Sequence, residues 1–247
     1  MDLLMRIATW NLESSKALSP ARKDSFRQAM AKVNADIWVL TETWFSFGPG
    51  DGYSMVAQSS MAEDLKAWPD RCWVSIWAKS SFDSRSQVIC SQPDRMACGR
   101  IEIPGQMDIV AVGTVLPWVS DKNFLGTYGF CRAVGDQEVD WAPQQTGPEL
   151  CAYLVAGDFN QSFPHVSRYG SSEGEIAVNN VLKKHDQLCL TEKRVLPSGK
   201  PMIDHICFSQ TAIKPDSVPN VDIWETPSIN GKPITDHVGV FVDLKVN

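Results

Sequence analysis

Basic charge, long apolar runs and patterned cysteines are all scarce in this sequence of 247 residues. Its 29 acidic residues outnumber its 23 basic ones and leave a net charge of -6. A protein that coats nucleic acid or an anionic membrane through bulk charge needs the opposite balance. No apolar stretch approaches the roughly 20 residues of a membrane helix. The sequence therefore excludes binding by bulk charge, but it leaves room for a local basic groove.

The N-terminus and the cysteines indicate a cytoplasmic protein. The first residues, MDLLMRIATWNLE, run directly into a strand-like pattern and contain no secretory signal. The seven cysteines form no CxxC pair and no zinc-type spacing, and their odd number favours a reduced compartment over a disulfide framework. We therefore expect no membrane partner. The sequence leaves the oligomeric state open and is compatible with a monomer.

Apolar material is plentiful enough for one large core, since 43% of the residues are hydrophobic and 21% are charged. Strand patterns occur at residues 6–13, 36–42, 72–78, 107–116, 152–157, 203–209 and 238–244. Helix starts are indicated at Ser19-Pro20 and at a capping box formed by Ser172 and Glu175. This order favours a layered α/β (α+β) architecture. We predict one domain over residues 1–247 with a loop-rich insertion around 119–150.

Acid and amide side chains gather where the predicted strands end or begin. The segments are WNLE (10–13), TET (41–43), GDFN (157–160) and TDH (235–237). In addition, Asp204 lies within an apolar strand, where a buried charge is costly without a partner or a metal. Several carboxylates in one place need a cation, and oxygen ligands with at most one histidine suit Mg²⁺ or Mn²⁺ better than Zn²⁺.

The order of these motifs resembles the endonuclease/exonuclease/phosphatase superfamily, which includes exonuclease III-type abasic-site endonucleases and DNase I. The matching segments are IATWNLE, DIWVLTET, LVAGDFNQS, MIDHICFS and TDHVGVFVDL, and they span residues 7 to 244. The resemblance implies a DNase I-like, four-layered α/β sandwich in which helices flank two packed mixed β-sheets. It also implies hydrolysis of a phosphoester bond by a metal-assisted water.

The resemblance also implies roles for seven residues. Glu42 is similar to the main metal-ligating carboxylate, with Asn11 beside it as a ligand or orienting group and Asp236 as a further carboxylate on the metal side. Asp158 is similar to the acid that positions or deprotonates the attacking water, and Asn160 to the amide that holds the scissile phosphate. His237 is similar to the catalytic histidine and Asp204 to the acid that fixes its tautomer and charge. Which residue is the general base stays open.

One departure from the family concerns the loop after the segment GTVLPW. Many members carry a tyrosine and an asparagine there, whereas this chain has Val115 and Trp118. Trp118 and Trp44 both follow strands that carry the predicted site, and both are candidate substrate contacts that could stack on an unpaired base, although Trp118 could instead pack internally.

Other polar residues near the motifs have simpler interpretations. His165 and Arg168 follow GDFN closely and are candidate contacts to the substrate. His205 points to the opposite face from Asp204 and is interpreted as structural. The basic pairs, such as Arg22-Lys23, are interpreted as solvated.

The leading prediction is a Mg²⁺-dependent hydrolase of phosphoester bonds, with nuclease activity on nucleic acid. The alternative with the same chemistry is a phosphatase or phosphodiesterase for a small phosphorylated metabolite or an inositol phosphate, which the acidic balance and the missing tyrosine and asparagine favour. A third possibility is a non-catalytic binding module on the same fold. It would be expected to lose its acids first, yet all seven motif positions are intact.

Overall fold

In the computed structural model, the described residues are 3–62, 65–118, 121, 126–141, 151–164, 169–196 and 198–247. The first half of the chain forms β1 (Leu3–Asn11), α1 (Pro20–Val33), β2 (Ile37–Trp44), β3 (Tyr53–Gln58), β4 (Arg71–Lys79), β5 (Asp83–Val88), β6 (Met96–Glu102) and β7 (Asp108–Val115). The second half forms α2 (Gly126–Trp141), β8 (Cys151–Asp158), α3 (Ser172–Lys184), β9 (Gln187–Cys189), β10 (Asp204–Ser209), the 3-10 helix η2 (Gln210–Ala212), β11 (Asn220–Trp224), β12 (Ser228–Ile229), β13 (Lys232–Pro233) and β14 (Gly239–Val246).

Among the described residues, the strands form two six-stranded mixed sheets and one small ribbon. The first sheet has the order β11-β14-β1-β2-β4-β3, and the second has the order β5-β6-β7-β8-β10-β9. Each sheet contains one parallel pair near its centre, β1 with β2 and β7 with β8, and its other neighbours are antiparallel. The ribbon pairs β12 with β13.

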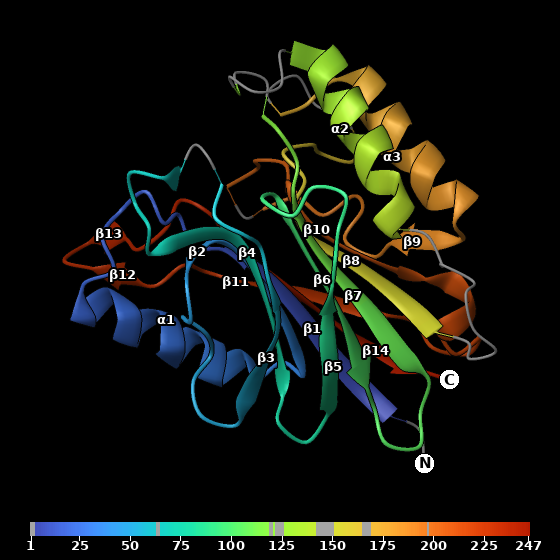
Figure 1. The fold of residues 1–247 in the computed structure, drawn as a ribbon, viewed down its shortest axis with the longest axis horizontal. Helices are drawn as coiled ribbons and strands as arrows, with labels where there is room; N and C mark the ends of the chain where they lie inside the picture. The colour runs from blue at the N-terminus through green and yellow to red at the C-terminus, as the bar shows by residue number, and fades with distance from the viewer. Residues whose placement is uncertain are drawn as a thin grey trace.

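The helices cover the outer faces of the two sheets, as Figure 1 shows: α1 packs outside the first sheet, and α2 and α3 pack side by side outside the second. One buried apolar cluster lies between the sheets and includes Ile7, Val39 and Leu154. A second lies under α2 and α3, and a third lies under α1. Because the central strands are buried on both faces, they read as continuous apolar runs such as IWVL in β2. The four-layered sandwich implied by the resemblance is therefore confirmed.

Local signals in the sequence explain where the helices begin. Ser19 caps α1 by accepting a hydrogen bond from the backbone N–H of Arg22, and Pro20 occupies the first turn. The cap of α3 is Ser171, one residue before the predicted Ser172, and it accepts from the N–H of Gly174. Since either serine can serve as a cap, sequence alone left this choice ambiguous by one position.

The prediction of a loop-rich insertion around residues 119–150 was wrong over its middle part. Residues 126–141 form α2, which buries Phe130, Val134 and Trp141 against the second sheet and α3. Its sequence contains two internal glycines and three acidic residues, which obscured the helical periodicity. His185, which ends α3, contacts Glu138 of α2 at 3.0 Å and fastens the two helices together.

No helix within the described ranges combines the length and the apolar character needed to cross a membrane.

Candidate active site

The polar ends of five strands meet at one end of the sandwich. Asn11 ends β1, Glu42 lies near the end of β2, and Asp158 ends β8. β10 runs antiparallel to β8, with Asp204 directly opposite Asp158. His237 comes just before β14, which runs antiparallel to β1. Strand direction alone therefore brings residues from distant parts of the chain to one place.

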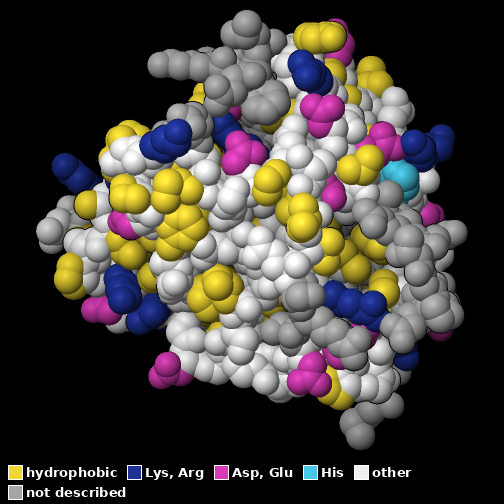
Figure 2. Space-filling model, viewed as in Figure 1, with side chains coloured by type: hydrophobic (Ala, Val, Ile, Leu, Met, Phe, Trp, Pro, Cys, Tyr) yellow, Lys and Arg dark blue, Asp and Glu magenta, His cyan; other side chains and the backbone are white. Residues whose placement is uncertain are grey.

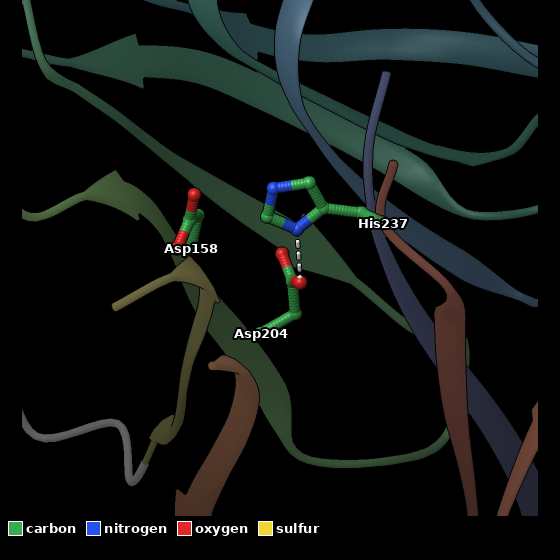
Figure 3. A group of neighbouring side chains, drawn as sticks. All are labelled: Asp158, Asp204 and His237. Atoms are coloured by element: carbon green, nitrogen blue, oxygen red, sulfur yellow. Dashed lines mark hydrogen bonds and ion pairs between the residues drawn. The ribbon is translucent and has the colours of Figure 1, made fainter. Parts of the chain in front are cut away.

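Asp158, Asp204 and His237 form the centre of this site (Figure 3). Each offers one ligand atom, and these atoms all lie within 4.8 Å of one another. His237 Nδ1 lies 2.6 Å from Oδ2 of Asp204, a short hydrogen bond between a largely buried ring and a buried carboxylate. With Nδ1 engaged, Nε2 is the ring nitrogen left to face a substrate.

Asn11 links Glu42 to this centre. Its Nδ2 donates to Oε1 of Glu42 at 2.9 Å and to Oδ2 of Asp158 at 3.0 Å. Its Oδ1 accepts from the backbone N–H of Glu13 at 2.8 Å. In this orientation the amide positions two carboxylates and turns its oxygen away from them, which matches an orienting role rather than that of a ligand.

The electrostatics of the site disfavour ionised carboxyls in the absence of a cation. Burial, together with the charges of Asp204 and Glu42, raises the pKa of Asp158 to about 7, although His237 acts in the opposite direction. Burial also raises the pKa of Glu42, although the hydrogen bond from Asn11 opposes this. Burial alone would lower the pKa of His237, but the charge and hydrogen bond of Asp204 outweigh it and raise the pKa well above its usual value.

These side chains fit a hard divalent cation. The donors are carboxylate oxygens, which Mg²⁺ prefers. Oδ1 of Asp204 is buried and accepts no hydrogen bond from the described residues. A cation would also supply the positive charge that the clustered carboxylates lack.

Two site residues hold a strained backbone. Glu42 has φ 42° and Asn160 has φ 48°, values that residues with a Cβ rarely adopt. At Asn160 the turn lets its backbone N–H donate to Oδ1 of Asp158 at 2.9 Å, while its Nδ2 donates to the carbonyl of Leu116 at 2.9 Å. Just before Asp158, a Cβ on Gly157 would lie 2.1 Å from the carbonyl oxygen of Thr114, so only glycine permits this close approach of β8 to β7.

Comparison with known proteins decides the family. The sequence pattern of the endonuclease/exonuclease/phosphatase family matches residues 8–237. The chain belongs to the endonuclease/exonuclease/phosphatase family. It is therefore a hydrolase of phosphoester bonds. No curated protein matches it by sequence.

Solved structures of endonuclease/exonuclease/phosphatase proteins share its fold. An AP endonuclease from Leishmania major superimposes with a TM-score of 0.71 at 14% identity, over 98% of this chain and 88% of that one. TDP2 of D. rerio, complexed with a single-strand DNA product, gives 0.69 at 16% identity over 98% of both chains. A mannosyl-6-phosphatase from Bacteroides thetaiotaomicron gives 0.67 at 15% identity, over 97% of this chain and 99% of that one.

Some residues predicted for the site lie elsewhere. Trp44 is only 3% exposed and packs among Phe26 and Phe47 under α1, so the prediction that it stacks on substrate was wrong. It follows Glu42 by two positions, but the left-handed backbone at Glu42 intervenes and its ring turns into the core. His165 and Arg168 lie outside the described residues.

Two other predicted residues, Asp236 and Trp118, lie at the edge of the site, and His205 is buried next to it. The side chain of Asp236 is 71% exposed, and its Oδ1 lies 3.9 Å from Nε2 of His237. Trp118 is 38% exposed and follows β7. His205 is buried and bonds Thr191 and the carbonyl of Gln161, both at 2.9 Å, as its structural interpretation predicted.

Beside His237, sequence reasoning missed a cleft of about 160 Å³. It is lined by Asn160, Asp204 and His237 together with Tyr169 and Lys200. Tyr169 precedes α3 and Lys200 precedes β10, and neither lies in a motif. No sequence signal would have placed them here, because both lie on loops whose position depends on the tertiary fold.

Arg22 was interpreted as solvated, but it is only 5% exposed. It lies in the first turn of α1, the helix that follows β1, and its guanidinium points into the loops at the site end of the sandwich. It donates to the backbone carbonyls of Leu12, Glu13, Lys16, Ala17 and Ile234. This arginine therefore ties the loop after Asn11 to the loop that carries Asp236 and His237. The five planar donors of arginine allow this, and lysine cannot reproduce it.

Arg22→Lys is expected to lower the free energy of unfolding by about 2 kcal/mol, because hydrogen bonds from a charged donor are lost. We expect kcat to fall about tenfold as His237 loses its exact position. Thermal denaturation and steady-state kinetics measure both. Arg132→Lys, at a largely exposed site on α2, is the matched control. An unchanged kcat in Arg22→Lys would show that Arg22 does not position the site.

Proposed function

We propose that this chain is a Mg²⁺-dependent phosphodiesterase that cleaves nucleic acid with a metal-assisted water. The observation that carries the proposal is the convergence of Asp158, Asp204 and His237 within 4.8 Å, with Asn11 holding Glu42 against Asp158. Glu42 would hold the cation, with Asp236 as a further candidate ligand and Asn11 orienting the Glu42 carboxylate. When bound, the ion neutralises charge on the phosphoryl oxygens and lowers the pKa of bound water.

The chain's own residues supply positioning and proton transfer. Asp158 is placed to orient the attacking water and accept its proton, because its raised pKa of about 7 suits a base at neutral pH. Nε2 of His237 is placed to contact the phosphate or donate to the leaving oxygen. Asp204 holds that ring through Nδ1 and favours its protonated form. Asn160 is placed to hold the scissile phosphate.

Nucleic acid as the substrate is supported by the family and by the fold shared with TDP2, which was solved with single-strand DNA product. The charge distribution indicates local rather than bulk recognition. On the face drawn in Figure 2, Lys and Arg side chains are scattered among Asp and Glu and form no continuous patch. Binding would then depend on contacts close to the reacting phosphate.

A small phosphorylated metabolite is the second candidate, and the cleft beside His237 favours it. The cleft measures about 160 Å³ and offers the Lys200 ammonium and the Tyr169 hydroxyl, which suit an anionic or hydroxylated group. The shared fold of a mannosyl-6-phosphatase is compatible with this candidate.

The test is hydrolysis by the purified protein with Mg²⁺ or EDTA. The substrates are single-stranded DNA, duplex DNA, RNA and a set of sugar phosphates. We expect cleavage of an oligonucleotide with Mg²⁺ and none with EDTA. Glu42→Gln is expected to weaken Mg²⁺ binding by at least about tenfold, because a ligand charge is lost. Asp216→Asn, in an exposed loop beside the far end of β14, controls for lost charge. Hydrolysis of sugar phosphates without cleavage of any nucleic acid would reject the nuclease proposal in favour of the phosphatase.

A further inference from the structure

Trp118 is a partly exposed residue that packs against Trp73 and Arg95. Its indole is 38% exposed and contacts Trp73 of β4 at a centroid distance of 6.1 Å and an interplanar angle of 48°. The guanidinium carbon of Arg95 lies 4.2 Å from the Trp73 ring centroid and 5.4 Å from that of Trp118. Two aromatic rings and one cation therefore form a single packed group, which we name the tryptophan platform: Trp73, Arg95 and Trp118.

A buried ion pair fixes this platform. Nη2 of Arg95 bonds Oδ2 of Asp121 at 2.9 Å, and both side chains are 3% exposed. Asp121 lies just after Trp118, and its backbone N–H donates to the Trp118 carbonyl at 2.9 Å. A buried charge pair is costly unless its geometry is good, so the pair holds Asp121 against Arg95 and, through the backbone hydrogen bond, holds the Trp118 carbonyl in place. Trp118 therefore has little conformational freedom to lose when a ligand stacks on it.

The platform borders the candidate active site. Leu116, two residues before Trp118, donates to the carbonyl of Asp158 and accepts from Nδ2 of Asn160, both at 2.9 Å. On the other sheet, Trp73 lies in β4 at the level of Glu42, because its neighbours Cys72 and Val74 pair with Thr43 and Thr41. The platform thus lies on the side of β4, β6 and β7.

The cleft with Tyr169 and Lys200 lies on the opposite side, next to β10 and the start of β14. A phosphate at Asn160 and His237 would therefore have an aromatic surface on one side and a polar cleft on the other. A phosphodiester carries organic groups on two of its phosphate oxygens and could contact both surfaces at once. A phosphomonoester carries only one such group and could contact only one of them.

We infer that the platform is a binding site for an unpaired nucleobase next to the scissile phosphate, so that the substrate is a single-stranded nucleic acid lying across the metal centre. This inference rests on the proposed function and specifies its substrate. A base within a duplex is stacked on both faces, and only an unpaired base offers a free face to Trp118. Every base has such a face, so the platform confers little sequence preference.

The test compares KM for a single-stranded oligonucleotide in the wild type, Trp118→Ala, Trp118→Leu and Trp118→Phe. We expect KM about tenfold higher in the Ala and Leu variants, equivalent to about 1.4 kcal/mol and within the range of one base–aromatic stack. Trp118→Phe keeps a ring and should stay within about threefold of the wild type. Trp118→Leu keeps the apolar packing without a π-face, so it remains informative if the Ala variant does not fold.

The discriminating substrate is the same oligonucleotide with abasic sites on both sides of the cleaved bond. There the wild type and Trp118→Leu should have equal KM values. A tenfold difference on this substrate would show a structural role and overturn the inference, as would equal values on the normal oligonucleotide.

Anisotropy titration of a labelled oligonucleotide in EDTA separates this inference from the proposed function. Weaker binding by Trp118→Leu supports the platform even if no cleavage occurs, whereas equal binding rejects the platform even if cleavage does.

Discussion

Asp158→Asn is expected to lower kcat by at least about 10³-fold, because it removes the group placed to accept a proton from the attacking water. The fold should persist, since asparagine has nearly the same shape and its one amide oxygen can still accept from either the N–H of Asn160 or Nδ2 of Asn11, although not from both. Single-turnover cleavage with saturating Mg²⁺ measures the chemical step. A loss smaller than tenfold would show that another residue is the base.

The same substitution should stabilise the metal-free protein above neutral pH. The pKa of Asp158 rises from 3.8 to about 7 on folding, so the folded state binds this proton more tightly than the unfolded state. Its contribution to stability is therefore complete below about pH 4 and is lost as the pH rises through 7. In EDTA at pH 8, Asp158→Asn should unfold with a free energy about 1–3 kcal/mol higher than the wild type.

Urea denaturation at pH 5 and pH 8 checks this expectation. At pH 8 in EDTA the variant should be the more stable protein, and the advantage should be smaller at pH 5. Mg²⁺ should reduce the advantage at pH 8, because a cation next to Asp158 favours the ionised carboxylate of the wild type. Equal free energies of unfolding for the variant and the wild type at both pH values would show that folding does not raise the pKa of Asp158.

Asp204→Asn is expected to lower kcat by about 10²–10⁴-fold, the usual range for loss of a proton-transfer group. The carboxylate both orients His237 through Nδ1 and raises its pKa. Without the charge, the pKa of His237 falls, so the ring loses its proton at a lower pH. The alkaline limb of the pH–rate profile should therefore move to lower pH.

The matched control is Glu138→Gln, which removes the acid partner of His185 between α2 and α3. It should leave both kcat and the pH profile unchanged. Asp204→Glu, which keeps the charge, should retain the wild-type position of the alkaline limb more closely than Asp204→Asn does. A large loss of kcat with no shift of the limb would mean that Asp204 acts on something other than the protonation of His237.

The layered fold could be predicted from sequence, because the short apolar runs and the helix caps are local signals. The run IWVL of β2 and the cap at Ser19 both occur where the patterns predicted them. The helix α2 could not be predicted, because its glycines and acids mask the apolar face that Phe130 and Trp141 bury. Only packing against β8 and α3 reveals that face.

The meeting of the candidate site residues at one end of the sandwich was predictable for a different reason. Asn11, Asp158, Asp204 and His237 lie at strand ends, and strand direction brings such ends together whatever the loops do. Arg22 and Trp44 follow no such rule. A charged side chain on an amphipathic helix is normally solvated, but the carbonyls of two distant loops make burial of Arg22 favourable. Trp44 was expected to face the substrate but is buried, because the left-handed backbone at Glu42 turns its ring into the core.

The position of β14 limits when the protein can become active during its synthesis. β14 pairs with β1 on one side and with β11 on the other, and Leu3 lies opposite Val246. The first sheet therefore has a gap between its earliest strand and β11 until residues 239–246 leave the ribosome. His237 directly precedes that closing strand, and its position opposite Asp204 depends on the strand being in place. A nascent chain thus carries Asn11, Glu42 and Asp158 without the histidine, so the candidate site is completed only when the first sheet closes.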